Sequence, residues 1–185
     1  MKKTIILLIL SALLIIGCGT SRKSVFSREP ILKISDELML TIQNAGTKSD
    51  YPNSDIINIM DIDSTSYDKS GLFDIYGYSL FKLLTMKAAR EFTSIPIGYD
   101  SQVMELEILF VRVIKKDGTV LTIPDSSIVD ETMPGYSEMD IYWSNLRQKT
   151  INLPKFNIGD ALELGIRYRG LQPYFDGIIE GNQSF

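Results

Sequence analysis

The sequence contains no histidine, and its only cysteine is Cys18. A Ser-His-Asp or Cys-His catalytic arrangement therefore cannot be assembled from this chain. Zinc sites of the usual His and Cys kind are excluded by the same counts. Glycosidase chemistry needs only two carboxylates at a defined separation and is not excluded, but no carboxylate is marked by its sequence context. We expect a non-catalytic chain with no cofactor and no metal.

The sequence also lacks a long run of Lys and Arg residues. The chain has 19 Lys and Arg residues against 23 Asp and Glu residues, which gives a formal net charge of −4. Proteins that bind nucleic acids neutralise phosphates with clustered basic side chains. We therefore expect no nucleic-acid partner, and the acidic balance is interpreted as a feature that promotes solubility.

The longest apolar run is too short to span a membrane. Lys2 and Lys3 precede an apolar stretch from Ile5 to Ile16, and Gly17-Cys18-Gly19 follows it. This stretch has about 12 residues, whereas a spanning helix needs about 20. Positive charge, a short apolar run and small residues, in that order, are typical of a secretory signal peptide. An uncleaved membrane anchor is the alternative, and the length of the run argues against it.

The end of this segment, Ile15-Ile16-Gly17-Cys18, resembles the lipobox of bacterial lipoproteins. The resemblance implies cleavage before Cys18 and attachment of diacylglycerol and palmitate-type acyl chains to this cysteine. Several acyl chains together make a durable membrane anchor, which one chain does not. The predicted partner of Cys18 is thus the membrane, reached through lipid. Because its sulfur is consumed by the lipid, no disulfide is expected.

The residues after the cysteine indicate a destination. Gly19 is not the aspartate that commonly retains lipoproteins at the inner membrane, and the next residues, 20–23, are basic rather than acidic. We therefore expect an outer-membrane protein of the bacterial cell envelope that faces the periplasm. The predicted organisation is a signal peptide at 1–17, a lipidated tether at 18–35 and a β domain at 36–185.

One short helix is predicted at the start of the domain. Asp36 is a candidate N-cap, apolar residues follow it, and Gly46 is a candidate terminator. Beyond the helix, runs of β-branched and aromatic residues predict strands. These strands are predicted at 56–62, 73–85, 103–114, 120–123, 146–153 and 161–169.

The last predicted strand shows the clearest alternation. Leu162, Leu164, Ile166 and Tyr168 fall on one face, and the other face carries Glu163, Arg167 and Arg169. One buried and one wet face predict an antiparallel sheet. Asp117-Gly118 predicts a tight hairpin turn before 120–123. Several such strands at short spacing favour a mainly β, antiparallel sandwich-like fold.

Four stretches carry a resemblance to a known family: Ile97-Gly98-Tyr99-Asp100, residues 111–118, Asn152-Leu153-Pro154, and residues 156–160 leading into 162–168. In their order they resemble a bacterial domain family called DUF3857, which precedes transglutaminase-like domains in secreted proteins and lipoproteins. The resemblance implies an all-β accessory module whose catalytic Cys-His-Asp partner lies in a separate, downstream domain. From this resemblance we expect the chain to be a fragment, incomplete at its C-terminus and lacking the transglutaminase core.

Three groups of residues are candidate sites, each with a structural alternative. The aromatic residues Tyr136, Tyr142 and Trp143 lie around a Pro-Gly turn and are candidates for a ligand platform for a glycan or peptide, although such residues more often fill a core. Arg147 and Arg167 suit carboxylate recognition, with an ion pair as the alternative. A carboxylate cluster lacks the spacing of a calcium loop, so a solvated strand face is favoured over a metal site; its members are Asp55, Asp61, Asp63 and Asp68.

Two functions remain open from the sequence. The favoured one is a non-catalytic, lipid-anchored envelope module that docks or presents a transglutaminase-like protein partner, in cis or in trans. The alternative is a free-standing lipoprotein that binds a glycan or a peptide.

Overall fold

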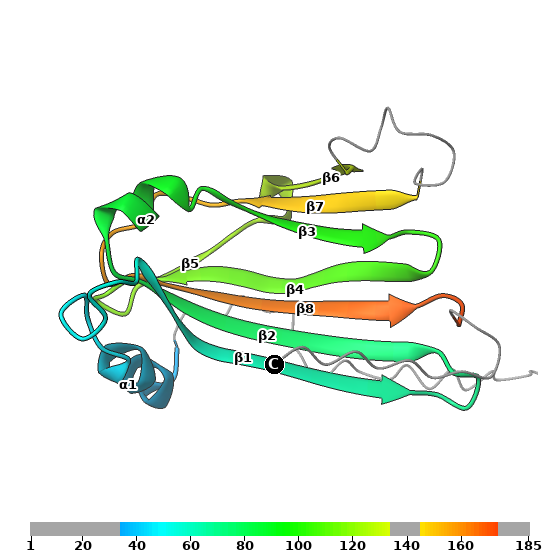
Figure 1. The fold of residues 1–185 in the computed structure, drawn as a ribbon, viewed down its shortest axis with the longest axis horizontal. Coiled ribbons are helices and arrows are strands. Elements are labelled where there is room, and N and C mark those ends of the chain that lie inside the picture. Colours follow the sequence, from blue (N-terminus) through cyan, green and yellow to red (C-terminus); the bar gives the residue numbers. More distant parts are fainter. Residues whose placement is uncertain (1–33, 134–144, 174–185) are drawn as a thin grey trace, which may run out of the picture.

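The computed structural model describes residues 34–133 and 145–173. In these ranges the chain forms two antiparallel β-sheets with two short α-helices (Figure 1). The predicted mainly β, sandwich-like class is confirmed. The elements are α1 (Asp36–Asn44), β1 (Ile56–Tyr67), β2 (Phe73–Leu83), α2 (Met86–Glu91), β3 (Ser94–Asp100), β4 (Met104–Ile114), β5 (Val120–Thr122), the 3-10 turn η1 (Asp125–Ser127), β6 (Ile128–Thr132), β7 (Leu146–Asn152) and β8 (Ala161–Gly170).

The larger sheet has five strands in the order β1-β2-β8-β4-β5, and the smaller sheet has three in the order β3-β7-β6. The chain crosses between the sheets after β2, β3, β5 and β7. In Figure 1 the smaller sheet lies above the larger one, and β3 lies next to β4 in that view. The last strand in sequence, β8, is the central strand of the larger sheet. Its two neighbours, β2 and β4, pair with it along almost their whole length.

Two hydrophobic clusters lie on opposite faces of the larger sheet. The first fills the space between the sheets, where Val111, Leu162 and Leu164 meet Ile151 of β7 and the side chains of α2. The second lies under α1, where Ile42 packs against Leu80, Ile114 and Ala161. The predicted apolar face of β8 therefore does point into the core between the sheets.

The first helix begins one residue earlier than predicted. Ser35, not Asp36, is its N-cap, because the Ser35 hydroxyl accepts a hydrogen bond from the Leu38 amide at 3.1 Å. Asp36 and Glu37 instead occupy the first turn, where acidic side chains interact favourably with the helix dipole. Helix α2, β3 and β6 were not predicted. These elements are short, and α2 begins directly after residues 73–85, for which the sequence predicts one long strand.

The C-terminal end of α1 is held by a buried lysine of β2. Lys82 is only 7% exposed, and its Nζ donates to the carbonyls of Ile42 at 2.7 Å and Gly46 at 2.8 Å. The last turn of α1 has no basic residue of its own. Lys82 therefore supplies the positive charge and the hydrogen bonds that the end of a helix needs. Burial lowers the pKa of this ammonium group.

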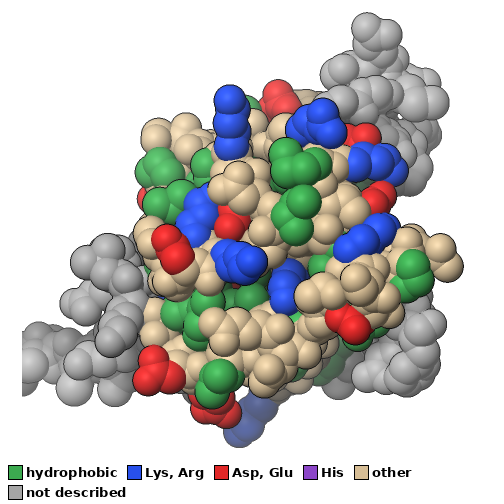
Figure 2. Space-filling model, turned by 90° about the vertical axis from the view of Figure 1, so that its left-hand side faces the viewer, with side chains coloured by type: hydrophobic (Ala, Val, Ile, Leu, Met, Phe, Trp, Pro, Cys, Tyr) green, Lys and Arg blue, Asp and Glu red, His purple; other side chains and the backbone are tan. Residues whose placement is uncertain are grey.

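The end of the molecule that carries both helices has a mixed surface. Figure 2 shows Lys, Arg, Asp and Glu side chains interspersed with apolar ones over the described part of this face, without a broad field of one sign. No helix in the described ranges is both long enough and apolar enough to cross a membrane.

Replacement of the buried lysine tests its role in holding α1. Lys82→Met keeps the apolar stem and removes the ammonium group, so the buried Ile42 carbonyl loses its donor. Leaving such a group unsatisfied costs about 1–3 kcal/mol, and we expect a loss of that size in the free energy of unfolding measured in urea. The matched control is Lys87→Met, which removes an exposed Nζ that lies 3.1 Å from Asp55. Equal midpoints for the two variants would contradict this account.

Candidate functional site

A wide open groove of about 1450 Å³ runs along the first half of β4. Among the residues that the structure describes, β5 pairs with β4 only over Arg112–Ile114, whereas β8 pairs with all of it. The Met104–Phe110 half of β4 therefore has a strand partner on one side only. The groove follows this half, and its other walls come from β6, β7, the end of β3, the connection from β5 to η1, and side chains of β2 and β8.

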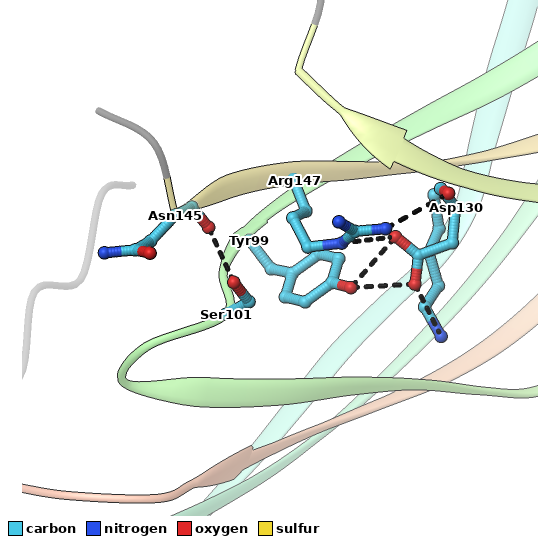
Figure 3. Close-up of polar contacts among 6 residues, drawn as sticks. Tyr99, Ser101, Asp130, Asn145 and Arg147 are labelled. Carbon is cyan, nitrogen blue, oxygen red and sulfur yellow. Dashed lines mark hydrogen bonds and ion pairs between the residues drawn. The ribbon is translucent and has the colours of Figure 1, made fainter. Parts of the chain in front are cut away.

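The smaller sheet contributes a polar wall, shown in Figure 3. Asp130 of β6 is the centre of this cluster. The Tyr99 hydroxyl donates to its two carboxylate oxygens at 3.0 and 2.8 Å, and Arg147 Nε donates to Oδ1 at 2.9 Å. Lys149 Nζ lies 3.7 Å from Oδ2. Nearby, the Ser101 hydroxyl donates to the Asn145 carbonyl at 2.9 Å and ties the end of β3 to the start of β7.

Strand register explains why these four side chains meet. Tyr99 lies opposite Arg147, and Asp130 lies opposite Lys149. Residues two apart on a strand share a face, so this polar group continues the same face on which Ile151 is buried in the core. The inner face of the smaller sheet thus changes from apolar to polar along its length. Its polar end borders the groove.

The surroundings of Tyr99 favour its neutral form. Burial, and then the hydrogen bond to the Asp130 carboxylate, raise the pKa of the Tyr99 phenol above its usual value. The hydroxyl therefore remains a hydrogen-bond donor throughout the neutral range. This arrangement can bind a polar ligand group.

On the other side of β4, the outer face of the larger sheet carries a buried ionic group. Glu163 of β8 is 3% exposed, accepts a hydrogen bond from the Tyr78 hydroxyl at 3.0 Å, and pairs with Arg112 Nε. The expectation of a wet face for Glu163 was wrong. Because β8 is the central strand, its neighbours cover this carboxylate on both sides. Burial and the Glu163 carboxylate raise the pKa of Tyr78.

Phe110 closes this group over a glycine. The Arg112 guanidinium lies 5.1 Å from the centroid of the Phe110 ring, a cation–π distance. The ring also covers Gly165, where an added Cβ would lie 2.5 Å from the ring. A side chain at position 165 would therefore displace Phe110 from the rim of the groove.

Two of the stretches that resemble the family, 111–118 and 156–160, contact each other through the buried Asp160. Asp160, which is 2% exposed, accepts hydrogen bonds from the Asn157 amide at 2.8 Å, the Lys116 amide at 3.2 Å and Lys115 Nζ at 2.7 Å. Its carboxylate thereby joins the turn before β8 to the hairpin between β4 and β5. Gly118 supplies the only positive φ in that hairpin, +87°, because Asp117 stays in the ordinary region. These motif residues shape the fold and do not line the groove.

The structure places the other sequence candidates apart from one another. Arg147 belongs to the polar wall, whereas Arg167 pairs with Asp74 on the outer face of the larger sheet, its guanidinium 4.8 Å from the Tyr76 ring centroid. Both arginines form ion pairs. Cys18, the aromatic residues Tyr136, Tyr142 and Trp143, and the 1–33 segment lie outside the described residues.

The aspartates considered as a calcium site are dispersed. Asp61 accepts from the Ser79 hydroxyl at 2.8 Å, Asp68 accepts from the Ser70 amide at 2.8 Å in the β1–β2 turn, and Asp55 contacts Lys87. In the described ranges, no three His, Cys, Asp or Glu side chains gather closely enough to hold a metal ion.

The groove residues Asp130 and Lys149 carried no signal in the sequence. Asp130 lies in a short, exposed strand that was not predicted, and its neighbours in space come from β3 and β7. Only the cross-strand register brings them together. Tyr99 was noted as part of a family motif, without a role.

Fold and site together define a β-sandwich module with an open groove beside a half-paired strand. Residues 69–185 match the family model described as "Domain of Unknown Function with solved-structure structure (DUF3857)". The chain therefore belongs to the DUF3857 family, as its motifs predicted. No curated protein matches it.

Two solved structures are similar to this chain. One is the crystal structure of a "putative protease" from Parabacteroides distasonis, with a TM-score of 0.60 and 16% identity over 65% of this chain. The match spans 24% of that protein, so this chain corresponds to about a quarter of its length. The other is a CBM3a-L domain from a Clostridium thermocellum cellulosome scaffoldin, with 9% identity over 71% of this chain and 79% of that one; its TM-score of 0.36 does not define a shared fold. The first likeness shows the fold alone.

The polar wall can be tested through the titration of Tyr99. We expect Asp130→Asn to lower the pKa of Tyr99, because the carboxylate that favours the neutral phenol has gone while Arg147 remains beside it. The titration is followed by ultraviolet absorbance. The signal of Tyr99 is obtained by subtracting the titration curve of the same protein carrying Tyr99→Phe. The control is Asp125→Asn, at a carboxylate with no hydrogen bond to Tyr99. An unchanged Tyr99 pKa in Asp130→Asn would contradict the geometry described here.

Proposed function

We propose that this chain is a non-catalytic, lipid-anchored module of the bacterial cell envelope that docks a transglutaminase-like protein partner, in cis or in trans. The observation that carries the proposal is the groove beside the half-paired strand β4. Its walls offer hydrogen-bonding groups, charges and apolar side chains for binding. The sequence has no histidine to serve as the base of a Cys-His or Ser-His site.

The fold comparison supports an accessory role. In the protein from Parabacteroides distasonis described as a "putative protease", the part similar to this chain makes up 24% of the length. In that protein, the part with the similar fold is joined to a much longer stretch of chain outside the match. A module that positions or presents such a remainder needs a binding surface, and the groove supplies one.

The sequence at the N-terminus supports the anchor. Lys2 and Lys3, the short apolar run from Ile5 to Ile16, and Gly17-Cys18 have the order expected of a lipoprotein signal. Acyl chains on Cys18 would hold the module at the outer membrane, on the periplasmic side. The residues between Cys18 and α1 would then serve as the tether.

Replacement of the lipobox cysteine tests the anchor. In cells fed radioactive palmitate, we expect the wild-type chain to be labelled and to sediment with membranes. Cys18→Ser should lose the label and leave the membrane fraction, because no thiol remains to be alkylated. Ser21→Ala is the matched control and should behave as wild type. Retention of Cys18→Ser in membranes would instead indicate an uncleaved apolar anchor.

Photocrosslinking in the native envelope tests the docking. A photoreactive amino acid at Asp125, on the exposed rim of the groove, should form an adduct with a protein that contains a transglutaminase-like Cys-His-Asp core. The same amino acid at Ser64, an exposed position on the edge strand β1, is the control and should not. Mass spectrometry identifies the adducts. Equal adducts from both positions, or none from Asp125, would refute the docking surface.

A further inference from the structure

We infer that the residues just before α1, 25–33, pack over the outer face of the larger sheet, where they cover an apolar strip that α1 leaves open. The outer face is the one turned away from the smaller sheet. The occupant is thus a segment of the same chain, called here the pre-helix segment. The packing itself is independent of the proposed function, whereas its effect on the tether rests on the proposed lipid anchor.

The apolar strip crosses the larger sheet in one row. Ile62 of β1 lies opposite Tyr78 of β2. On the far side of Tyr78, Gly165 of β8 separates it from Phe110 of β4. Because the glycine has no side chain, the two rings meet above it, with their centroids 6.5 Å apart. Met60 lies two residues before Ile62, on the same face, and extends the strip along β1.

The β1 end of this strip is exposed. α1 covers the neighbouring part of the outer face, where Ile42 packs with Leu80 and Ala161 at one end of the sheet (Figure 1). Beyond α1, Ile62 is 55% exposed and Met60 is 37% exposed. Single exposed apolar residues are ordinary on a protein surface, but adjacent ones that continue a core cluster mark a surface for packing.

The chain enters the described structure on this same face. Ile34 is 8% exposed and belongs to the cluster under α1, against which Tyr78 of the strip also packs. The pre-helix segment therefore joins the domain beside the strip. A segment attached at such a point has an effective concentration on the order of millimolar for the adjacent surface, an advantage that a separate molecule lacks.

The composition of the pre-helix segment is that of a packing segment and not of a flexible linker. Flexible linkers are rich in glycine and serine. Residues 25–33 contain no glycine, and four of them are large and apolar: Val25, Phe26, Ile31 and Leu32. Pro30 disfavours helix at the residue before it and so favours an extended course.

The length of the segment fits the strip. Nine extended residues span about 30 Å. The strip crosses from β1 to β4, which are separated by β2 and β8 in the strand order. Three strand spacings amount to about 14 Å. The segment is thus long enough to reach from Ile34 across all four strands.

Packing of this segment shortens the free tether. Fully extended, residues 18–33 reach about 55 Å, whereas residues 18–24 reach about 24 Å. With the lipid anchor proposed above at Cys18, the domain would be held at less than half its full distance from the membrane. The pre-helix segment would then act as part of the domain and not as part of the tether.

Trypsin cleavage of the full chain in neutral detergent measures the packing, because cleavage tracks the fraction of time a segment is open. Mass spectrometry follows cleavage after Arg28, inside the segment, and after Lys23, before it. A synthetic peptide of residues 19–33 gives the ratio of these two rates without the domain. We expect the ratio of Arg28 to Lys23 cleavage to be lower in the full chain by roughly tenfold or more. An equal ratio in chain and peptide would overturn the inference.

A variant of the strip locates the contact. Ile62→Glu places a charge in the strip at an exposed position, and we expect it to raise the cleavage ratio by roughly fivefold or more. The matched control is Val129→Glu, at a position of the smaller sheet that is 44% exposed, and it should leave the ratio unchanged. Equal effects of the two variants would overturn the assignment to the outer face. So would protection that weakens on dilution, because the occupant would then be a second copy.

The variant Cys18→Ser separates this inference from the proposed anchor. If it leaves the membranes and keeps the low cleavage ratio, both stand. If it stays in the membranes and keeps the low ratio, the packing stands and the lipid anchor falls. If it leaves the membranes while the wild-type chain shows the ratio of the free peptide, the anchor stands and the packing falls.

Discussion

Burial of β8 on both faces is the constraint on which the rest of the structure depends. Residues 161–165 are all buried, although this stretch carries a carboxylate at its middle. Arg112 of β4 and Tyr78 of β2 satisfy Glu163 from the two sides. Such a pair adds little net stability over an apolar core, but a carboxylate left unpaired there would cost several kcal/mol. The ion pair therefore selects which strands flank β8 and in which register. Because β4 is fixed in this way, its free half comes to lie beside the smaller sheet.

The sequence predicted those parts of the fold that depend on local pattern. Alternation at Leu162 and Leu164 indicated the strand and its core face, and the glycine at position 118 indicated the hairpin. The wet face predicted for Glu163 failed, because the number of strands on either side of β8 is a property of the whole sheet. Ser35 displaced Asp36 as the helix cap, since both residue types suit that position and only geometry decides between them. The groove could not be predicted, because Tyr99, Asp130 and Lys149 come from three strands.

Most residues of the family motifs stabilise the fold, whereas the groove is a surface feature beside β4. Asp160 joins the turn before β8 to the β4–β5 hairpin, so residues of the family motifs hold β4 in place beside β8. Of the motif residues, Tyr99, Val111, Arg112 and Glu163 line the groove. Membership of the DUF3857 family thus accounts for how the surface is built.

The buried Lys82 also gives the molecule a mechanical design. The chain enters the domain through Ile34 and α1, and α1 is fastened to β2 at its far end by one ammonium group. A pull on the N-terminal part of the chain would load α1 first and then pass through Lys82 into β2. β2 pairs with β1 on one side and with β8 on the other, so the load would be shared as shear across two ladders of hydrogen bonds. Without Lys82 the same pull would reach β1 first, because this edge strand follows α1 in the chain, and an edge strand can be peeled away one hydrogen bond at a time.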